Sequence, residues 1–168
     1  MISHLTYRPR EGVLFGTVAG RTLRLATLRN QPALEMETWR QAIQSAGTRV
    51  TGWPKLQEIR TGMPAGPVQH SLTVAENAAL EVYDYPGAYA QRFDGVDPGG
   101  AGGGSNHPHH ARVVWVTLAP GTRFPGGGFH LHGPPPCGNP RCIVIGQDWE
   151  SLFQALKATG RVSIAVEL

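Results

Sequence analysis

Lysine is nearly absent from this 168-residue chain, which has 2 lysines and 13 arginines among its 15 basic residues. With 12 acidic residues the formal net charge is only +3, and the arginines are scattered along the chain. Proteins that bind nucleic acids commonly carry a basic run or stripe that follows the phosphate backbone. The sequence therefore does not favour DNA or RNA as a partner.

Cysteine and long apolar runs are also scarce. The 2 cysteines are too few for a disulfide-stapled scaffold. No run approaches the ~18 to 20 consecutive apolar residues that a membrane-spanning helix needs. The first residues, MISHLTYRPREG, have no apolar stretch of the kind found in a secretory signal peptide. We therefore expect a cytoplasmic protein without a membrane span.

Glycine and proline, in contrast, are abundant, with 22 and 14 copies, and 20 of these lie within positions 95–140. This uneven distribution divides the chain into four segments. They are a strand–strand–helix segment at 1–47, a β segment at 48–98, a Gly/Pro/His-rich loop or linker at 99–140, and a helix and strand at 141–168.

The spacing of apolar residues predicts short strands and two helices. Alternation between turn residues predicts strands at 12–18, 21–28, 48–53, 68–74, 80–85 and 161–168. Apolar residues with helical spacing predict helices near 32–46 and 149–159. We therefore expect an α+β, mostly β fold of short antiparallel strands arranged as a barrel or sandwich.

Two segments carry a family resemblance. Residues 80–95 read LEVYDYPGAYAQRFDG, and residues 48–62 read TRVTGWPKLQEIRTG. Together they resemble the hub-like region of VgrG, the spike protein of type VI secretion systems, over about residues 48–100. The positions that carry the resemblance are Trp53, Gln57, Glu58, Tyr83, Asp84, Tyr85, Pro86, Gly87, Tyr89, Arg92, Phe93 and Asp94.

The resemblance implies a barrel-like hub fragment with a structural role. In that family the region belongs to a trimeric, phage-baseplate-like pedestal, which implies self-association and contact with secretion-apparatus or effector proteins. It also implies a bacterial protein that is cytoplasmic before assembly and is delivered by the type VI apparatus. Downstream the chain has neither an OB-fold nor needle repeats, so the family relation would be that of a truncated or recombined remnant. The sequence also shows no nucleophile–base or paired-carboxylate pattern, so we do not expect an enzyme.

Histidine and cysteine residues suggest an alternative function. His130 and His132 are spaced to share one face of a strand. With Cys137 and Cys142 they would supply two nitrogen and two sulfur ligands, a set suited to Zn²⁺. Residues 113–132 also resemble a cupin strand, with Pro-Gly-x-x-Phe-Pro followed by His-x-His, although the Glu expected after the histidine pair is missing. The main prediction is thus a structural protein without a cofactor, and the alternative is a small zinc-binding protein of cupin-like or knuckle-like type.

Overall fold

The computed structural model describes residues 2–29, 32–47, 49–62, 68–75, 78–86, 112–124, 127–134, 136, 138–159 and 161–168. The described helices are α1 (Pro32–Ala46) and α3 (Trp149–Lys157). The described strands are β1 (Ile2–Arg8), β2 (Val13–Val18), β3 (Arg21–Leu28), β4 (Val50–Gly62), β5 (Val68–Ala75), β6 (Ala78–Pro86), β7 (Arg112–Leu118), β8 (Phe129–His132), β9 (Cys142–Ile145) and β10 (Arg161–Val166).

Eight of the ten described strands close into a barrel in the order β10-β1-β2-β3-β9-β8-β7-β4, and β4 pairs again with β10. Closure leaves no unpaired sheet edge among these eight strands. The expected α+β, mostly β fold is confirmed, with helices at Pro32–Ala46 and Trp149–Lys157. Most neighbouring strands are antiparallel, whereas β1 with β10, β8 with β9 and β4 with β6 are parallel.

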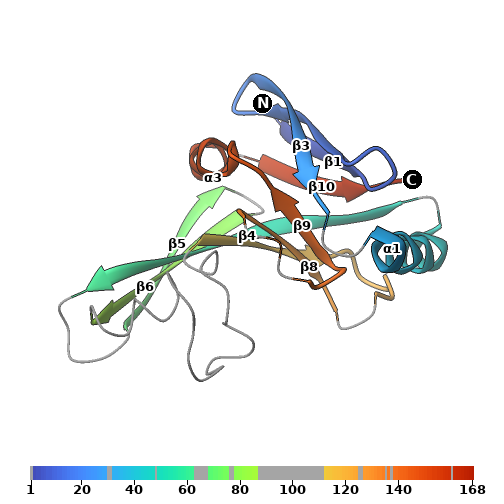
Figure 1. Cartoon of the computed structure of the whole chain (residues 1–168). Helices are drawn as coiled ribbons and strands as arrows, with labels where there is room; N and C mark the ends of the chain where they lie inside the picture. Colours follow the sequence, from blue (N-terminus) through green and yellow to red (C-terminus); the bar gives the residue numbers. More distant parts are fainter. Residues whose placement is uncertain are drawn as a thin grey trace.

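Strand β4 is 13 residues long and takes part in two structures. Residues 50–58 pair with β10 and β7 inside the barrel, whereas residues 56–62 pair with β6. Strand β5 pairs with the other side of β6. We call β5, β6 and residues 58–62 of β4 the arm. Figure 1 shows the arm extending from one end of the barrel, away from α1.

The seam where the barrel closes depends on a glycine. Gly52 pairs with Ile164 of β10 on one side and with Leu118 of β7 on the other. A Cβ atom at Gly52 would lie 2.4 Å from the carbonyl oxygen of Thr117. Because real Cβ atoms do not approach a carbonyl oxygen so closely, only glycine fits this seam without a shift of the backbone.

Helix α1 covers one end of the barrel through a cluster of aromatic rings. Trp39 is fully buried, and its ring centroid lies 5.8 Å from that of Tyr7 on β1. It also lies 5.1 Å from Phe124 and 5.2 Å from Phe129 on β8. Such tilted and edge-on contacts are favourable arrangements for aromatic side chains. The apolar stripe of the predicted helix therefore faces the core.

Helix α3 covers the opposite end of the barrel. Helix α1 follows β3 and α3 follows β9, and because β3 and β9 are antiparallel, the two helices begin at opposite ends. Leu152, Phe153 and Leu156 are buried and belong to the same hydrophobic core as the barrel strands. Beyond the helix, the hydroxyl groups of Thr159 and Ser3 form a buried hydrogen bond. Both ends of the barrel are thus covered by amphipathic helices.

Two strands lie in the segment whose composition predicts a loop or linker. Residues 112–118 form β7 and residues 129–132 form β8. Val113, Val114 and Val116 are buried, so the strand is stabilised by its packing in the barrel despite the glycine and proline around it. The described part of 99–140 therefore contributes to the barrel.

Candidate functional site

A cluster of ion pairs lies where β4 leaves the barrel. The Glu58 side chain is buried, with its Oε1 atom 3.6 Å from Arg112 Nε and its Oε2 atom 3.5 Å from Lys157 Nζ. Arg112 also pairs with Glu150 on α3. The Arg112 and Lys157 charges lie 5.9 Å and 6.0 Å from the centre of the Phe153 ring. Cations near an aromatic face are attracted to it, so this cluster fastens α3 to the strands.

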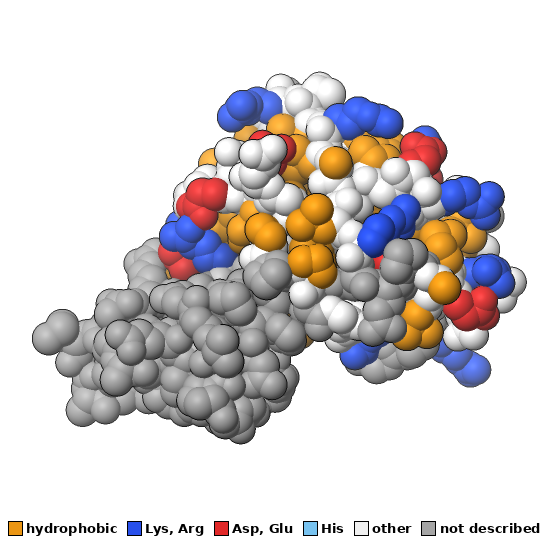
Figure 2. Space-filling model, viewed as in Figure 1, with side chains coloured by type: hydrophobic (Ala, Val, Ile, Leu, Met, Phe, Trp, Pro, Cys, Tyr) orange, Lys and Arg blue, Asp and Glu red, His pale blue; other side chains and the backbone are white. Residues whose placement is uncertain are grey.

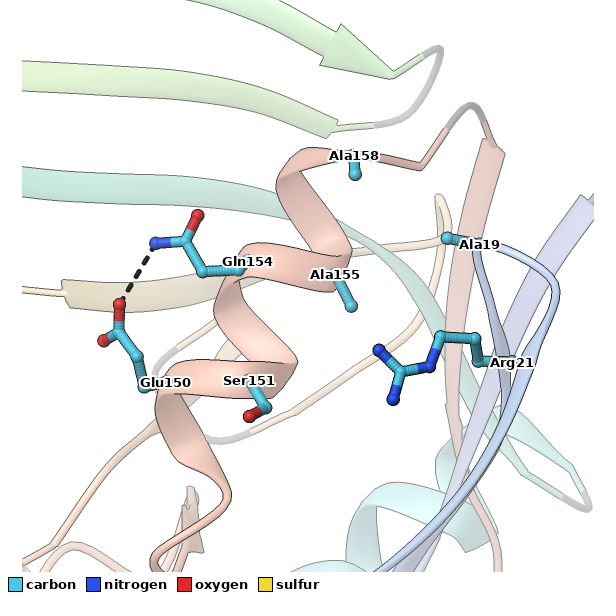
Figure 3. A pocket seen from close by; sticks show the side chains of 7 residues that line it. All are labelled: Ala19, Arg21, Glu150, Ser151, Gln154, Ala155 and Ala158. Atoms are coloured by element: carbon cyan, nitrogen blue, oxygen red, sulfur yellow. Dashed lines mark hydrogen bonds between the residues drawn. The ribbon is translucent and has the colours of Figure 1, made fainter.

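On the other side of α3 the barrel end is hollowed, as Figure 3 shows. We call this hollow the α3 groove. Its volume is about 440 Å³, and it lies between α3 and the turn that joins β2 to β3. Its lining residues are Ala19, Arg21, Glu150, Ser151, Gln154, Ala155 and Ala158.

The two walls of the α3 groove differ in chemistry. Ser151 and Ala155 of α3 and Ala158 directly after it contribute small side chains, so the groove is mostly apolar there (Figure 3). Glu150, at its rim, pairs with Arg112 and accepts a hydrogen bond of 3.1 Å from Gln154 Nε2. The opposite wall carries the exposed guanidinium of Arg21.

A second, smaller hollow of about 370 Å³ lies at the α1 end. It is lined by Gln41 and Ser45 of α1 and by Arg123 and Phe124. The backbone N–H of Arg123 donates a 3.1 Å hydrogen bond to Ser45 Oγ, which fixes the loop against the helix. Its polar groups thus take part in holding the loop in place.

Below α1 the barrel interior contains a buried polar group. Burial, and to a smaller extent the nearby carboxylate of Glu35, raise the pKa of the Tyr7 hydroxyl from 10.0 to about 12. The positive charge of Arg29 acts in the opposite direction. The hydroxyl therefore stays protonated throughout the physiological pH range.

The residues that resemble VgrG fall on β4 and β6. Trp53 and Gln57 are partly exposed on β4, and Gln57 Oε1 accepts a 2.7 Å hydrogen bond from Trp115 Nε1. Glu58 is buried in the ion-pair cluster. In the backbone register, Tyr83, Asp84, Tyr85 and Pro86 of β6 pair with residues 59–62 of β4. Gly87, Tyr89, Arg92, Phe93 and Asp94 lie outside the described residues.

Three of the four predicted zinc ligands lie on neighbouring strands. His130 of β8 is the register partner of Cys142 of β9, and the His130 and His132 ring centroids are 6.4 Å apart. His132 is buried, with its Nδ1 atom 2.6 Å from the carbonyl oxygen of Gly133. Cys137 lies outside the described residues. Among the described residues, no three His, Cys, Asp or Glu side chains are arranged to hold a metal ion.

Sequence reasoning did not identify Arg21 or Arg112 as site residues. A signal for Arg21 was present, because the strand alternation that places Leu23 and Leu25 on one face also places Arg21 there. Arg21 is the first residue of β3 and follows the same face as Leu23 and Leu25, so it lies at the end of the barrel, where its side chain is exposed. Arg112 gave no comparable signal, since its partners lie 54 and 38 positions away in sequence.

The visible surface in Figure 2 shows Lys and Arg side chains separated by acidic and neutral ones. None of the helices in the described part of the chain is long and apolar enough to cross a membrane. Comparison with known proteins adds no relative: no protein-family model, curated protein sequence or solved structure matches this chain.

Proposed function

We propose that this protein is a structural component that works by protein–protein assembly without catalysis, as a fragment that resembles the VgrG hub of a type VI secretion system. The observation that carries the proposal is the arm. It extends the barrel sheet beyond the closed strands and contains the segment of β6 that resembles VgrG. A sheet that continues past a closed barrel offers backbone groups for pairing with another chain.

The outer strand of the arm supports this role. Within the described residues β5 is the last strand of the sheet and pairs only with β6. Its sequence, VQHSLTVA, contains no Lys, Arg, Asp, Glu or Pro. Charged residues and prolines are the usual means by which an edge strand avoids pairing with other chains. Strand β5 lacks these means and is suited to pairing.

Self-association tests the proposal directly. We expect the full chain to form an oligomer, a trimer by the family resemblance, in size-exclusion chromatography with light scattering. Ser71→Lys places a charge on β5 at the position paired with Glu81 and should shift the protein toward monomer. The matched control, Thr22→Lys, adds the same charge to an exposed position of β3 and should leave the oligomer intact.

A pull-down with type VI tube and spike proteins extends the test to other partners. We expect the full chain to retain at least one of them, and Ser71→Lys to weaken that retention. A protein that is monomeric at every concentration and retains none of these proteins would contradict the assembly role.

A second candidate function, zinc binding, is favoured by the hydrogen bond at His132. A carbonyl oxygen only accepts, so Nδ1 of His132 must donate to Gly133 and carry the proton. The lone pair of His132 then lies on Nε2, as in histidines that bind metals with a backbone carbonyl as second partner. The parallel pairing of β8 with β9 makes Cys142, another of the predicted ligands, the register partner of His130.

Elemental analysis tests the zinc hypothesis. We expect close to one equivalent of zinc in the purified chain, a lower melting temperature after EDTA, and loss of the metal in Cys142→Ser. His4→Gln is the control, because His4 hydrogen-bonds Ser163 at the β1–β10 pair and belongs to no predicted ligand set. Less than about a tenth of an equivalent, with unchanged melting after EDTA, would rule out structural zinc.

A further inference from the structure

The α3 groove has the shape and position of a binding site. It lies in the mouth of the barrel, between α3 and the turn joining β2 to β3. Ligands of β-barrel proteins commonly bind at the mouth, in hollows of roughly 300 to 1,000 Å³. With a volume of about 440 Å³ and an open side, the α3 groove accommodates a few side chains of an extended peptide.

Both walls of the α3 groove are held in place before anything binds. Helix α3 is fixed by its buried Phe153 and by the Glu150–Arg112 and Glu58–Lys157 pairs. On the other wall, the backbone N–H of Ala19 donates a 3.1 Å hydrogen bond to Ser3 Oγ. Because little ordering remains to be done, binding would not lose much conformational entropy.

The helix wall of the α3 groove is mostly apolar and lined by small residues. Ser151, Ala155 and Ala158 follow at intervals of four and three positions, so they share one face of the helix. The neighbouring long side chains of Glu150 and Gln154 hydrogen-bond each other at the rim. Short aliphatic side chains of a partner could therefore contact the helix backbone closely.

The charge of the α3 groove is unbalanced. Glu150 is paired with Arg112, whereas no carboxylate in the described residues forms an ion pair with Arg21. Figure 3 shows the Arg21 side chain extending toward the helix across the groove. A guanidinium presents a planar fork of N–H donors that matches a carboxylate. The groove is thus complementary to a negatively charged group next to an apolar one.

We propose that the α3 groove binds an acidic peptide segment of a partner protein, with a Glu or Asp carboxylate on Arg21 and a neighbouring small aliphatic side chain on Ala155 and Ala158. This inference rests on the proposed role in protein–protein assembly and names the chemistry of one partner. Nucleic acid fits less well, because a phosphate backbone needs a row of basic residues and Arg21 is the one basic residue in the lining.

An array of hexapeptides tests the proposal with the full chain. Each peptide carries one glutamate among alanine, valine, serine and leucine, and each has a twin with glutamine in place of glutamate. We expect the protein to prefer glutamate peptides. In fluorescence polarisation with the tightest of them, Arg21→Gln should weaken binding about tenfold or more, as for loss of a charged hydrogen bond. Ser151→Phe should also weaken binding, because it fills the groove.

Arg24→Gln is the matched control, since it removes the same charge from β3 at an exposed position outside the lining. It should bind as tightly as the unmodified protein. Equal binding of glutamate and glutamine peptides, equal losses in Arg21→Gln and Arg24→Gln, or tighter binding of a single-stranded oligonucleotide would each overturn the proposal.

The same samples in light scattering separate the two proposals. If the protein is an oligomer but does not prefer glutamate peptides, the proposed groove ligand is wrong and assembly through the arm still stands. If the protein is a monomer that retains no secretion protein but prefers glutamate peptides, assembly through the arm is wrong and the groove is the site of protein contact.

Discussion

Phe153 is the residue through which α3 closes its end of the barrel, and its truncation tests that closure. The side chain is fully buried, lies 5.7 Å from the Trp149 ring, and has the charges of Arg112 and Lys157 near its faces. Phe153→Ala would remove this ring and leave a cavity below the helix. Truncations of buried Phe to Ala typically lower the free energy of unfolding by about 3 to 5 kcal/mol.

Such a loss is large relative to the whole stability of a domain, which is roughly 5 to 15 kcal/mol. For a chain of this length it corresponds to a melting temperature lower by about 6 to 20 °C, at roughly 2 to 4 °C per kcal/mol. Phe153→Leu keeps most of the apolar volume but loses the two cation contacts, so we expect a smaller decrease, of about 1 to 2 kcal/mol.

Urea unfolding followed by tryptophan fluorescence measures both variants. Ser151→Ala is the control, because Ser151 is exposed on the same helix and its truncation should change stability by less than about 0.5 kcal/mol. If the free energy of unfolding of Phe153→Ala lies within about 1 kcal/mol of that of the unmodified protein, α3 does not close the end of the barrel as described.

Three further predictions concern the barrel itself. Because the folded pKa of Tyr7, about 12, lies above its ordinary value of 10.0, the stability it contributes is complete below pH 10 and is lost between pH 10 and 12. In urea unfolding, the free energy of unfolding should fall by roughly 2 to 3 kcal/mol between pH 10 and 12, and this decrease should be absent in Tyr7→Phe. If the unmodified protein and Tyr7→Phe show the same dependence on pH, the raised pKa is contradicted. Gly52→Ala should lower the free energy of unfolding by about 1 to 3 kcal/mol, because its Cβ atom would collide with the backbone at the seam. Gly146→Ala is the control: its Cβ position has open space around it, so the decrease should be less than about 0.5 kcal/mol. Equal decreases in the melting temperatures of the two variants would show that the seam tolerates a side chain. Glu167→Ala breaks a half-exposed ion pair with Arg8, and thermal melts should show that the free energy of unfolding falls by less than about 1 kcal/mol. A larger decrease would mean that this pair stabilises the C-terminal strand.

Much of the secondary structure could be predicted because its signals are local. The helix over Pro32–Ala46 is marked by the spacing of Met36, Trp39 and Ile43, and the structure places Trp39 and Ile43 in the core. The alternation in residues 21–28 likewise predicts β3 with its observed bounds. Such patterns depend on which side of an element is buried, and a single sequence contains that information.

The closure of the barrel could not be predicted in the same way. It depends on β4 pairing with β10 and on β1 pairing with β10, which join residues more than 100 positions apart. Residues 112–118 show a related difficulty, because glycine and proline on both sides hide an ordinary valine-rich strand. Composition averaged over a window does not reveal an element shorter than that window.

The candidate site is an intermediate case. Strand alternation was sufficient to place Arg21 on the core-facing side of β3, although it gave no information about what would lie opposite. The groove exists only because α3, more than 120 positions later, packs beside that residue. A site built from distant elements can be recognised only when the packing is known.

The double use of β4 has a mechanical consequence. A pull on the arm along this strand would load its hydrogen bonds to β7 together, as a shear, because both the arm and the barrel are joined to the same continuous backbone. Bonds loaded together resist force better than bonds opened one after another. In a subunit of this design, a force applied to the arm along β4 would be transmitted to the whole barrel, because the hydrogen bonds between β4 and β7 would not break one after another.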